Sequence, residues 1–210
     1  MINNEQIRKA EKLIQYIYKT EHNFVPVTQR TPYNHMGATI VDSILQAGLN
    51  YKTVVYPRVK KLILSYPDYK TTCDFLILIQ TIPLTNLINW TNEVKINRIK
   101  ELSWFLYNNS IETEANLAIW LEDYKNKQRL KQINGIGNKT IDYLTMLSGK
   151  PAIAIDRHLF KYLEYAGVVV KSYEEANKIY SYVANQLDMT FYELDKKIWT
   201  YMSNLSISYT

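Results

Sequence analysis

A lysine and an aspartate 17 positions apart, Lys139 and Asp156, are the residues of this chain that could carry out sugar chemistry together. Lys139 lies in the segment INGIGNKT (residues 133–140), where a helix is expected to begin. The helix macrodipole disfavours a cation in the first turn and therefore favours the neutral amine. A neutral amine is a nucleophile that can attack an electrophilic carbon such as C1′ of a sugar, expel the group bound there and form a Schiff base. The alternative for Lys139 is a surface lysine that contacts phosphate.

Asp156 begins a stretch with a helical pattern, residues 156–165. Aspartate is a common N-cap, so a purely structural role is one interpretation. In the other, the carboxylate is held near C1′, where it stabilises an oxocarbenium-like transition state and helps to deprotonate Lys139 or a water. The two interpretations are compatible.

Two of the 6 glycines are concentrated in the segment that contains Lys139. Glycine tolerates positive φ and allows close approach of the backbone, so a sharp turn between two short helices is expected. The isoleucine between the glycines can fold back between those helices, and the second helix then offers backbone N–H groups to a phosphate. Such a contact holds DNA without reading its sequence. The hairpin residues expected to contact DNA are Gly135, Ile136, Gly137, Asn138 and Thr140.

An ordinary αα-hairpin that turns at glycine is the alternative, and the glycines alone favour it. A basic run before the hairpin shifts the interpretation toward phosphate binding, although such runs are most often solvated helix faces. The run comprises Lys125, Lys127, Arg129 and Lys131.

Composition limits the class of protein. Of the 210 residues, 47% are hydrophobic, which is enough to bury a core and argues against disorder. The net charge of +5 is a mild indication of a polyanionic partner. The N-terminus has no signal-peptide core, and no apolar run approaches the roughly 20 residues of a membrane helix. We expect an intracellular monomer, cytoplasmic or nucleoid-associated, with no membrane partner.

Helical periodicity extends over nearly the whole chain, which predicts an all-α fold. In the first helix, for example, Ala10, Leu13 and Ile17 share one face. The runs AIAI (152–155) and VVV (168–170) are too short to build a sheet. The expected helices are 5–20, 36–47, 53–66, 72–80, 93–108, 113–124, 127–133, 138–147, 156–165, 173–187 and 191–203.

The segment LKQINGIGNKTIDYL (130–144) resembles the helix-hairpin-helix motif of the HhH-GPD DNA glycosylases, the endonuclease III superfamily. That family follows the hairpin with a Gly/Pro loop and an aspartate, and GKPAIAIDRHLF (149–160) has Gly149, Pro151 and Asp156. Residues 42–67 are similar to the early helices of the adenine glycosylase branch, and residues 194–203 resemble the helix that closes the second lobe. The resemblance therefore covers the chain from about residue 36 onward. The hairpin departs from many members in having Asn134 instead of proline.

The resemblance implies two helical lobes and a set of functional residues. One lobe, at 30–150, is a multi-helix barrel that carries the helix-hairpin-helix at 127–147, and the other combines 1–29 with 151–210. Asp156 would be catalytic, and Lys139 is typical of lyase-competent members. Asp42 falls where a longer glutamate protonates the leaving base. Gln46, on the same helix face, falls where a side chain fills the gap left in the duplex; the alternative for both is the polar stripe of an amphipathic helix.

Many relatives hold an iron–sulfur cluster with four cysteines. This chain has only Cys73, so we expect no cluster and no other cofactor. The three histidines have no spacing suited to a metal, so no metal site is expected. The packing of helix 5–20 against 173–203 would take over the structural role of the cluster.

These features together predict a bifunctional DNA repair glycosylase. It would flip a damaged, mismatched or modified base out of double-stranded DNA and remove it, with AP (β-)lyase activity through Lys139. One alternative is a monofunctional glycosylase in which Asp156 activates water, and another is a non-catalytic helix-hairpin-helix DNA-binding module. Candidates for the wall of the base pocket are Tyr33, His35, Trp90 and His158, and further candidates for DNA contact are Arg58, Lys60, Lys95 and Arg98.

Overall fold

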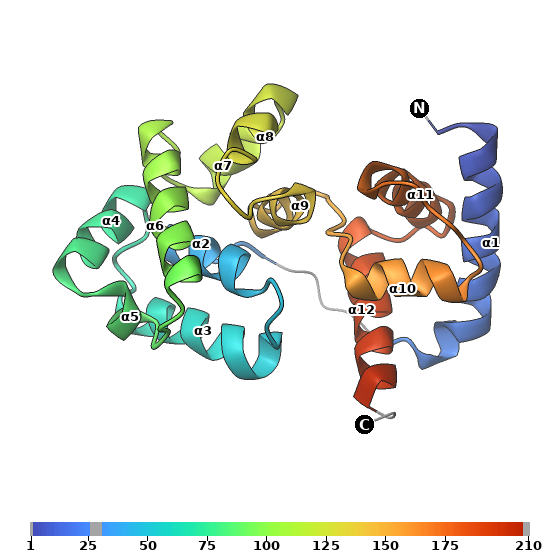
Figure 1. The fold of residues 1–210 in the computed structure, drawn as a ribbon, viewed down its shortest axis with the longest axis horizontal. Coiled ribbons are helices and arrows are strands. Elements are labelled where there is room, and N and C mark those ends of the chain that lie inside the picture. Colours follow the sequence, from blue (N-terminus) through green and yellow to red (C-terminus); the bar gives the residue numbers. More distant parts are fainter. Residues whose placement is uncertain (1, 26–30, 208–210) are drawn as a thin grey trace. The chain divides into compact units, whose positions relative to one another are not determined.

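The computed structural model describes residues 2–25 and 31–207. Within them every regular element is helical, which confirms the predicted all-α class (Figure 1). The chain separates into two compact units, a central unit of residues 31–150 and a terminal unit of residues 1–30 with 151–210. Among the described residues, none of the helices is both long and apolar enough to span a bilayer.

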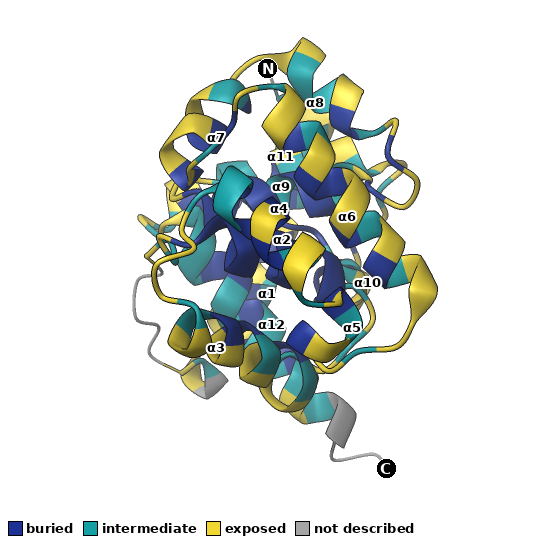
Figure 2. Cartoon of the chain, turned by 90° about the vertical axis from the view of Figure 1, so that its left-hand side faces the viewer, coloured by how far each residue is buried: buried dark blue, intermediate teal, exposed yellow. Residues whose placement is uncertain are grey.

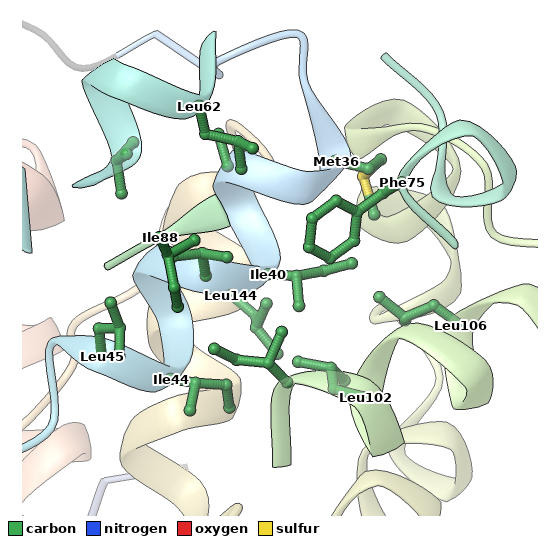
Figure 3. Close-up of a cluster of buried hydrophobic side chains, with 14 of the residues drawn as sticks. Met36, Ile40, Ile44, Leu45, Leu62, Phe75, Ile88, Leu102, Leu106 and Leu144 are labelled. Atoms are coloured by element: carbon green, nitrogen blue, oxygen red, sulfur yellow. The ribbon is translucent and has the colours of Figure 1, made fainter. Parts of the chain in front are cut away.

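The central unit is built around α2 (Met36–Leu45), all ten residues of which are buried (Figure 2). Helices α3, α4, α6 and α9 pack against it. Figure 3 shows this core, with Ile40 and Ile44 of α2 facing side chains from the surrounding helices. The other elements of the unit are η2 (Tyr51–Val55), α3 (Tyr56–Ser65), α4 (Thr72–Thr81), α5 (Leu84–Leu87), α6 (Glu93–Asn108), α7 (Glu114–Trp120), α8 (Tyr124–Leu130) and α9 (Asn138–Leu147).

The predicted helix at 53–66 differs from the structure. A π-helical turn, η2, precedes α3, and Pro57 lies in the first turn of α3. Proline has no N–H to donate to the residue four positions earlier, so the bond from position 57 to Thr53 O is missing where α3 begins. The turn closes instead with bonds to the fifth residue back, from Val55 N to Asn50 O and from Tyr56 N to Tyr51 O. The short helix α5 was not expected from the sequence.

A buried polar pair fixes the start of α2. The His35 side chain caps the helix, because its Nδ1 accepts a hydrogen bond from Ala38 N (3.1 Å). Its Nε2 lies 3.2 Å from Tyr66 O, and because a carbonyl oxygen can only accept, Nε2 must carry the proton. Nδ1 accepts a bond and is therefore unprotonated, so the ring is the neutral Nε2–H tautomer. The buried Glu114 accepts from His35 N (2.9 Å) and from the Thr39 hydroxyl (2.8 Å).

The stability of the central unit is therefore expected to fall in mild acid. Burial lowers the pKa of His35 from its ordinary value of 6.5. Below pH 6.5 the unfolded chain takes up a proton that the native ring resists, so the free energy of unfolding decreases as the pH falls from 6.5 toward the native pKa. In His35→Asn, which keeps a capping oxygen, thermal unfolding at pH 5.5 and 7.5 should differ less than in the wild type. The exposed His22→Asn is the control, and an unchanged pH slope in His35→Asn would contradict the prediction.

The terminal unit has its own core. It consists of α1 (Asn4–Thr20), η1 (Glu21–Asn23), α10 (Arg157–Tyr165), α11 (Tyr173–Gln186) and α12 (Phe191–Ile207). Helix α1 packs against α11 and α10 against α12, and the four helices share one buried cluster. A partly buried ion pair between Lys9 and Glu175 (2.6 Å) joins α1 to α11. These contacts tie the N-terminal helix to the last three helices.

Candidate functional site

The predicted hairpin is present between α8 and α9. Its turn uses a left-handed Gly135, with φ of +82°, and closes with a bond from Ile136 N to Ile133 O (3.0 Å). Ile136 is only 3% exposed and belongs to the same core cluster as Leu130 and Ile141, one on each helix. Ile136 therefore joins the two helices from inside, as the sequence predicted.

The two glycines of the hairpin have different roles. Only Gly135 needs positive φ, and a Cβ on it would overlap the guanidinium group of Arg98. Gly137 is the N-cap of α9 and has φ of −112°, a conformation open to any residue. Apart from its chain neighbours and the nearby backbone of α9, no atom of the described residues lies within 4 Å of the position that a Cβ on Gly137 would take. The start of α9 is thus uncovered at this point, which suits close approach of a ligand.

Lys139 is the second residue of α9 and lies in its first turn, as predicted. Its side chain is half-buried, and Nζ donates a hydrogen bond to Gln46 Oε1 at 2.9 Å. Gln46 is the C-cap of α2. The structure thus brings together two of the predicted site residues that lie 93 positions apart in the sequence.

Asp42 belongs to the same contact between α2 and α9. Asp42 and Gln46 are four residues apart on α2, and Lys139 and Tyr143 are four apart on α9, so each pair shares a helix face. Tyr143 Oη donates to Asp42 Oδ1 (3.2 Å) and Oδ2 (3.3 Å), directly beside the Lys139–Gln46 contact. Sequence reasoning missed Tyr143, although its spacing from Lys139 matches that of Asp42 from Gln46.

Two further tyrosines complete this cluster. Tyr33 Oη donates to Asp42 Oδ2 at 2.7 Å, and the Tyr51 hydroxyl lies 3.1 Å from that of Tyr33. Asp42 has no exposed surface, so its carboxylate needs these donors to be tolerated inside the core. The geometry presents Asp42 as an acceptor for phenol protons. Its role as proton donor to a leaving base remains a prediction.

Three of the cationic side chains predicted to contact DNA donate hydrogen bonds to backbone carbonyls. Lys95 Nζ donates to Ile44 O (2.9 Å) and Ala47 O (2.8 Å) at the end of α2. Arg98 Nε donates to Asn134 O in the hairpin turn. Arg58 donates to two carbonyls and stacks over Trp90 at 5.0 Å. Burial lowers the pKa of Lys95, and the nearby charges of Arg98 and Lys139 lower it further.

Asp156 is the N-cap of α10 in the terminal unit. Its Oδ1 accepts from His158 N (2.8 Å) and Leu159 N (3.2 Å). Its Oδ2 has no hydrogen-bond partner among residues 2–25 and 31–207. One oxygen of the half-buried carboxylate therefore orients the group, and the other makes no hydrogen bond to the described residues.

The segment before Asp156 is extended and held by side chains of α11 and α12. Tyr173 Oη accepts from Ile155 N (3.2 Å), and Asp195 Oδ2 accepts from Ala154 N (3.1 Å). Asn177 donates to Ile153 O at 3.1 Å. These side chains satisfy backbone groups that a neighbouring strand would otherwise serve. The short AIAI run therefore needs no sheet, and the position of Asp156 is fixed from the preceding residues.

The remaining residues that were predicted to line the base pocket have structural contacts of their own. His35 is the buried cap described above, and His158 packs edge-on against Trp199 (5.9 Å). Trp90 lies beneath Arg58. No group of three or more metal-binding side chains of the His, Cys, Asp and Glu types is found in the described part of the chain.

Comparison with known proteins agrees with the fold. The structure is similar to the crystal structure of the Helicobacter pylori 3-methyladenine DNA glycosylase (MagIII) bound to 1,N6-ethenoadenine. The TM-score is 0.58 at 12% sequence identity, and the match covers 96% of this chain and 98% of that chain. This likeness confirms the helical HhH-GPD glycosylase fold. No curated protein sequence matches significantly. The model of a family described as a domain of unknown function, DUF8548, matches residues 91–203, more than half of the chain, which therefore belongs to the DUF8548 family.

Proposed function

We propose that this protein is a DNA base-excision glycosylase that removes a damaged, mismatched or modified base from double-stranded DNA, with associated β-lyase activity through Lys139. The observation that carries the proposal is the position of Lys139 in the first turn of α9, directly after the hairpin turn. The fold likeness to a DNA glycosylase supports the reaction class. Asp156 Oδ2, which has no hydrogen-bond partner in the described part of the chain, supports a carboxylate that acts on the sugar.

The proposed first step breaks the glycosidic bond. The lone pair of Lys139 Nζ forms a bond to C1′, while the bond from C1′ to the base breaks and its electron pair leaves with the base. Nζ then loses a proton, the C1′–O4′ bond opens, and O4′ takes a proton. The product is a protonated imine between Nζ and C1′. Loss of a proton from C2′ then expels the 3′-phosphate, which is the β-elimination that nicks the strand.

Asp156 would stabilise the positive charge that develops on the sugar as the base leaves. A preorganised carboxylate is effective here because it needs no reorientation during the step. Capping of α10 by Oδ1 supplies that preorganisation, and Oδ2 would face the sugar. The same oxygen could accept the proton that Lys139 Nζ loses.

The start of α9 would hold the DNA backbone. A helix N-terminus favours a phosphate, and the open space above Gly137 supports close approach of one. Such contacts would anchor the duplex while the target nucleotide leaves the stack, a step that costs a few kcal/mol. Mismatched or damaged bases lower this cost, which would favour them as substrates.

The decisive experiment uses a panel of duplexes that each contain one lesion. The panel includes oxidised, deaminated, mismatched and hypermodified bases, with 3-methyladenine and 1,N6-ethenoadenine added because the similar structure is of a glycosylase with that name and ligand. Base release and strand nicking are scored separately. Borohydride, which reduces an imine, is expected to trap a covalent adduct on abasic-site DNA in the wild type and in the exposed-lysine control Lys12→Ala. Lys139→Ala should give no adduct.

The outcomes separate the alternatives. Base release without any adduct or nick would establish a monofunctional glycosylase, in which Asp156 activates water and Lys139 contacts phosphate. DNA binding without base release on any duplex would support the alternative of a non-catalytic helix-hairpin-helix DNA-binding module. An adduct that persists in Lys139→Ala would assign the nucleophile to another amine.

A further inference from the structure

Gln46 has a fixed backbone position beside Lys139. Its backbone N–H donates to Asp42 O (3.0 Å), and this bond closes the last turn of α2. Lys95 Nζ binds the carbonyls on either side, Ile44 O at 2.9 Å and Ala47 O at 2.8 Å. A cation at the C-terminal end of a helix stabilises that end. The Cα of Gln46 is therefore held from both sides, and its side chain starts from a defined point.

The two ends of the Gln46 amide are in different situations. Oε1 accepts a hydrogen bond from Lys139 Nζ at 2.9 Å. Nε2 is buried and finds no hydrogen-bond partner among the described residues. Exchanging the two atoms would point the NH₂ group at the lysine, donor against donor, so the orientation with Oε1 toward Lys139 is the favourable one.

This arrangement does not serve stability. A buried donor without a partner costs about 1–3 kcal/mol, and an apolar side chain such as leucine would avoid that cost. The amide at position 46 is better explained by what its oxygen does for Lys139. A neutral acceptor can direct the amine without adding a negative charge that would favour the ammonium form.

Two charged groups of the central unit lie near Lys139: the Asp42 carboxylate on α2 favours the ammonium form, and the Lys95 ammonium on α6 disfavours it. Lys95 and Lys139 are close enough for their charges to repel, which contributes to the lowered pKa of Lys95. Repulsion between two cations acts on both of them, so the positive charge of Lys95 also disfavours the ammonium form of Lys139. A carboxylate at position 46 would cancel this effect, whereas the amide preserves it.

We propose that Gln46 is a positioning residue for the Lys139 amine, which it holds by a neutral hydrogen bond, rather than a side chain whose main role is to fill the gap in the duplex. The inference rests on the proposed lyase function. It deepens that function by assigning to α2 the placement of the nucleophile on α9.

Two substitutions test the proposal through the pH dependence of borohydride trapping on abasic-site DNA. In Gln46→Glu the new carboxylate favours the ammonium, so trapping at neutral pH should fall about tenfold and the acidic limb of the profile should move to higher pH. In Gln46→Leu the amine loses this hydrogen bond, so trapping should fall about tenfold while the acidic limb of the profile stays at the same pH. The affinity for abasic-site DNA should stay within about twofold of wild type in both.

The exposed Gln80→Glu, on α4 of the same unit, is the matched control and should leave the profile unchanged. If both Gln46 variants trap at the wild-type rate and pH, or if they lose DNA affinity and nothing else, the positioning role is overturned. The second of these results would assign Gln46 to gap filling.

A measurement without DNA keeps this inference distinct from the proposed function. The ¹³Cε signal of Lys139, identified by its loss in Lys139→Arg, reports ionisation of the amine. Its titration midpoint should be higher in Gln46→Glu than in the wild type. If the wild type forms no adduct, the lyase proposal fails, yet this titration still decides whether Gln46 controls the amine. Identical midpoints would overturn the inference.

Discussion

Asp156→Asn should abolish most of the base release while leaving the protein folded. Asparagine is as good an N-cap as aspartate, so its amide oxygen can keep the bonds from His158 N and Leu159 N. The negative charge is lost, and with it the stabilisation of the positive sugar in the transition state. Removing one preorganised electrostatic group lowers kcat by about a hundredfold to a thousandfold, and we expect a loss of this size. Single-turnover base release at saturating enzyme measures it.

Two further variants separate charge from helix capping. Asp123 caps α8 in the central unit, where Oδ1 accepts from Lys125 N (2.8 Å), so Asp123→Asn is a matched control that should keep full activity. Asp156→Ala removes both charge and cap, and should also lower the free energy of unfolding by about 1 kcal/mol. Wild-type base release in Asp156→Asn would show that the carboxylate serves α10 alone.

Much of the scaffold was predictable because its signals are local. Apolar residues at helical spacing predicted the helices that form the two cores, and the Gly-Ile-Gly run predicted the turn before α9. The first-turn position of Lys139 follows from that turn, since α9 begins directly after the N-cap Gly137. The π-helical turn at Tyr51–Val55 was not predictable in this way, because it depends on how the chain enters α3 at Pro57.

The side-chain partners of the site could not be predicted because they come from separate segments. Asp42 is tolerated in the core because tyrosines from a loop and from α9 donate to it. Gln46, which accepts a hydrogen bond from Lys139, lies at the C-terminal end of α2, 93 positions earlier in the sequence. The sequence of one chain does not indicate which helix faces will meet. The cations were visible, but the carbonyls that hold Lys95 and Arg98 exist only once α2 and the hairpin are folded.

The two hairpin glycines offer a test in which neighbouring positions should give opposite results. Gly135→Ala places a Cβ at φ +82°, where side chains are strained, and against the Arg98 guanidinium. Arg98 can move away only by giving up its bond to Asn134 O. Strain of about 1 kcal/mol and a lost charge-assisted bond of about 1.5–3 kcal/mol predict destabilisation by about 2.5–4 kcal/mol. Denaturant unfolding of the variant measures this loss.

Gly137→Ser is the matched substitution two residues on. Position 137 has ordinary φ and open space, and serine is a good N-cap, so the free energy of unfolding should be unchanged or rise by a few tenths of a kcal/mol. The hydroxymethyl group fills the space through which a phosphate would approach α9, so affinity for duplex DNA should fall.

A double variant is the control for Gly135→Ala. In the Arg98→Ala background, Gly135→Ala should retain only the backbone strain of about 1 kcal/mol. If Gly137→Ser binds DNA as tightly as the wild type, the backbone at the start of α9 does not hold phosphate, and the hairpin serves only to place Lys139.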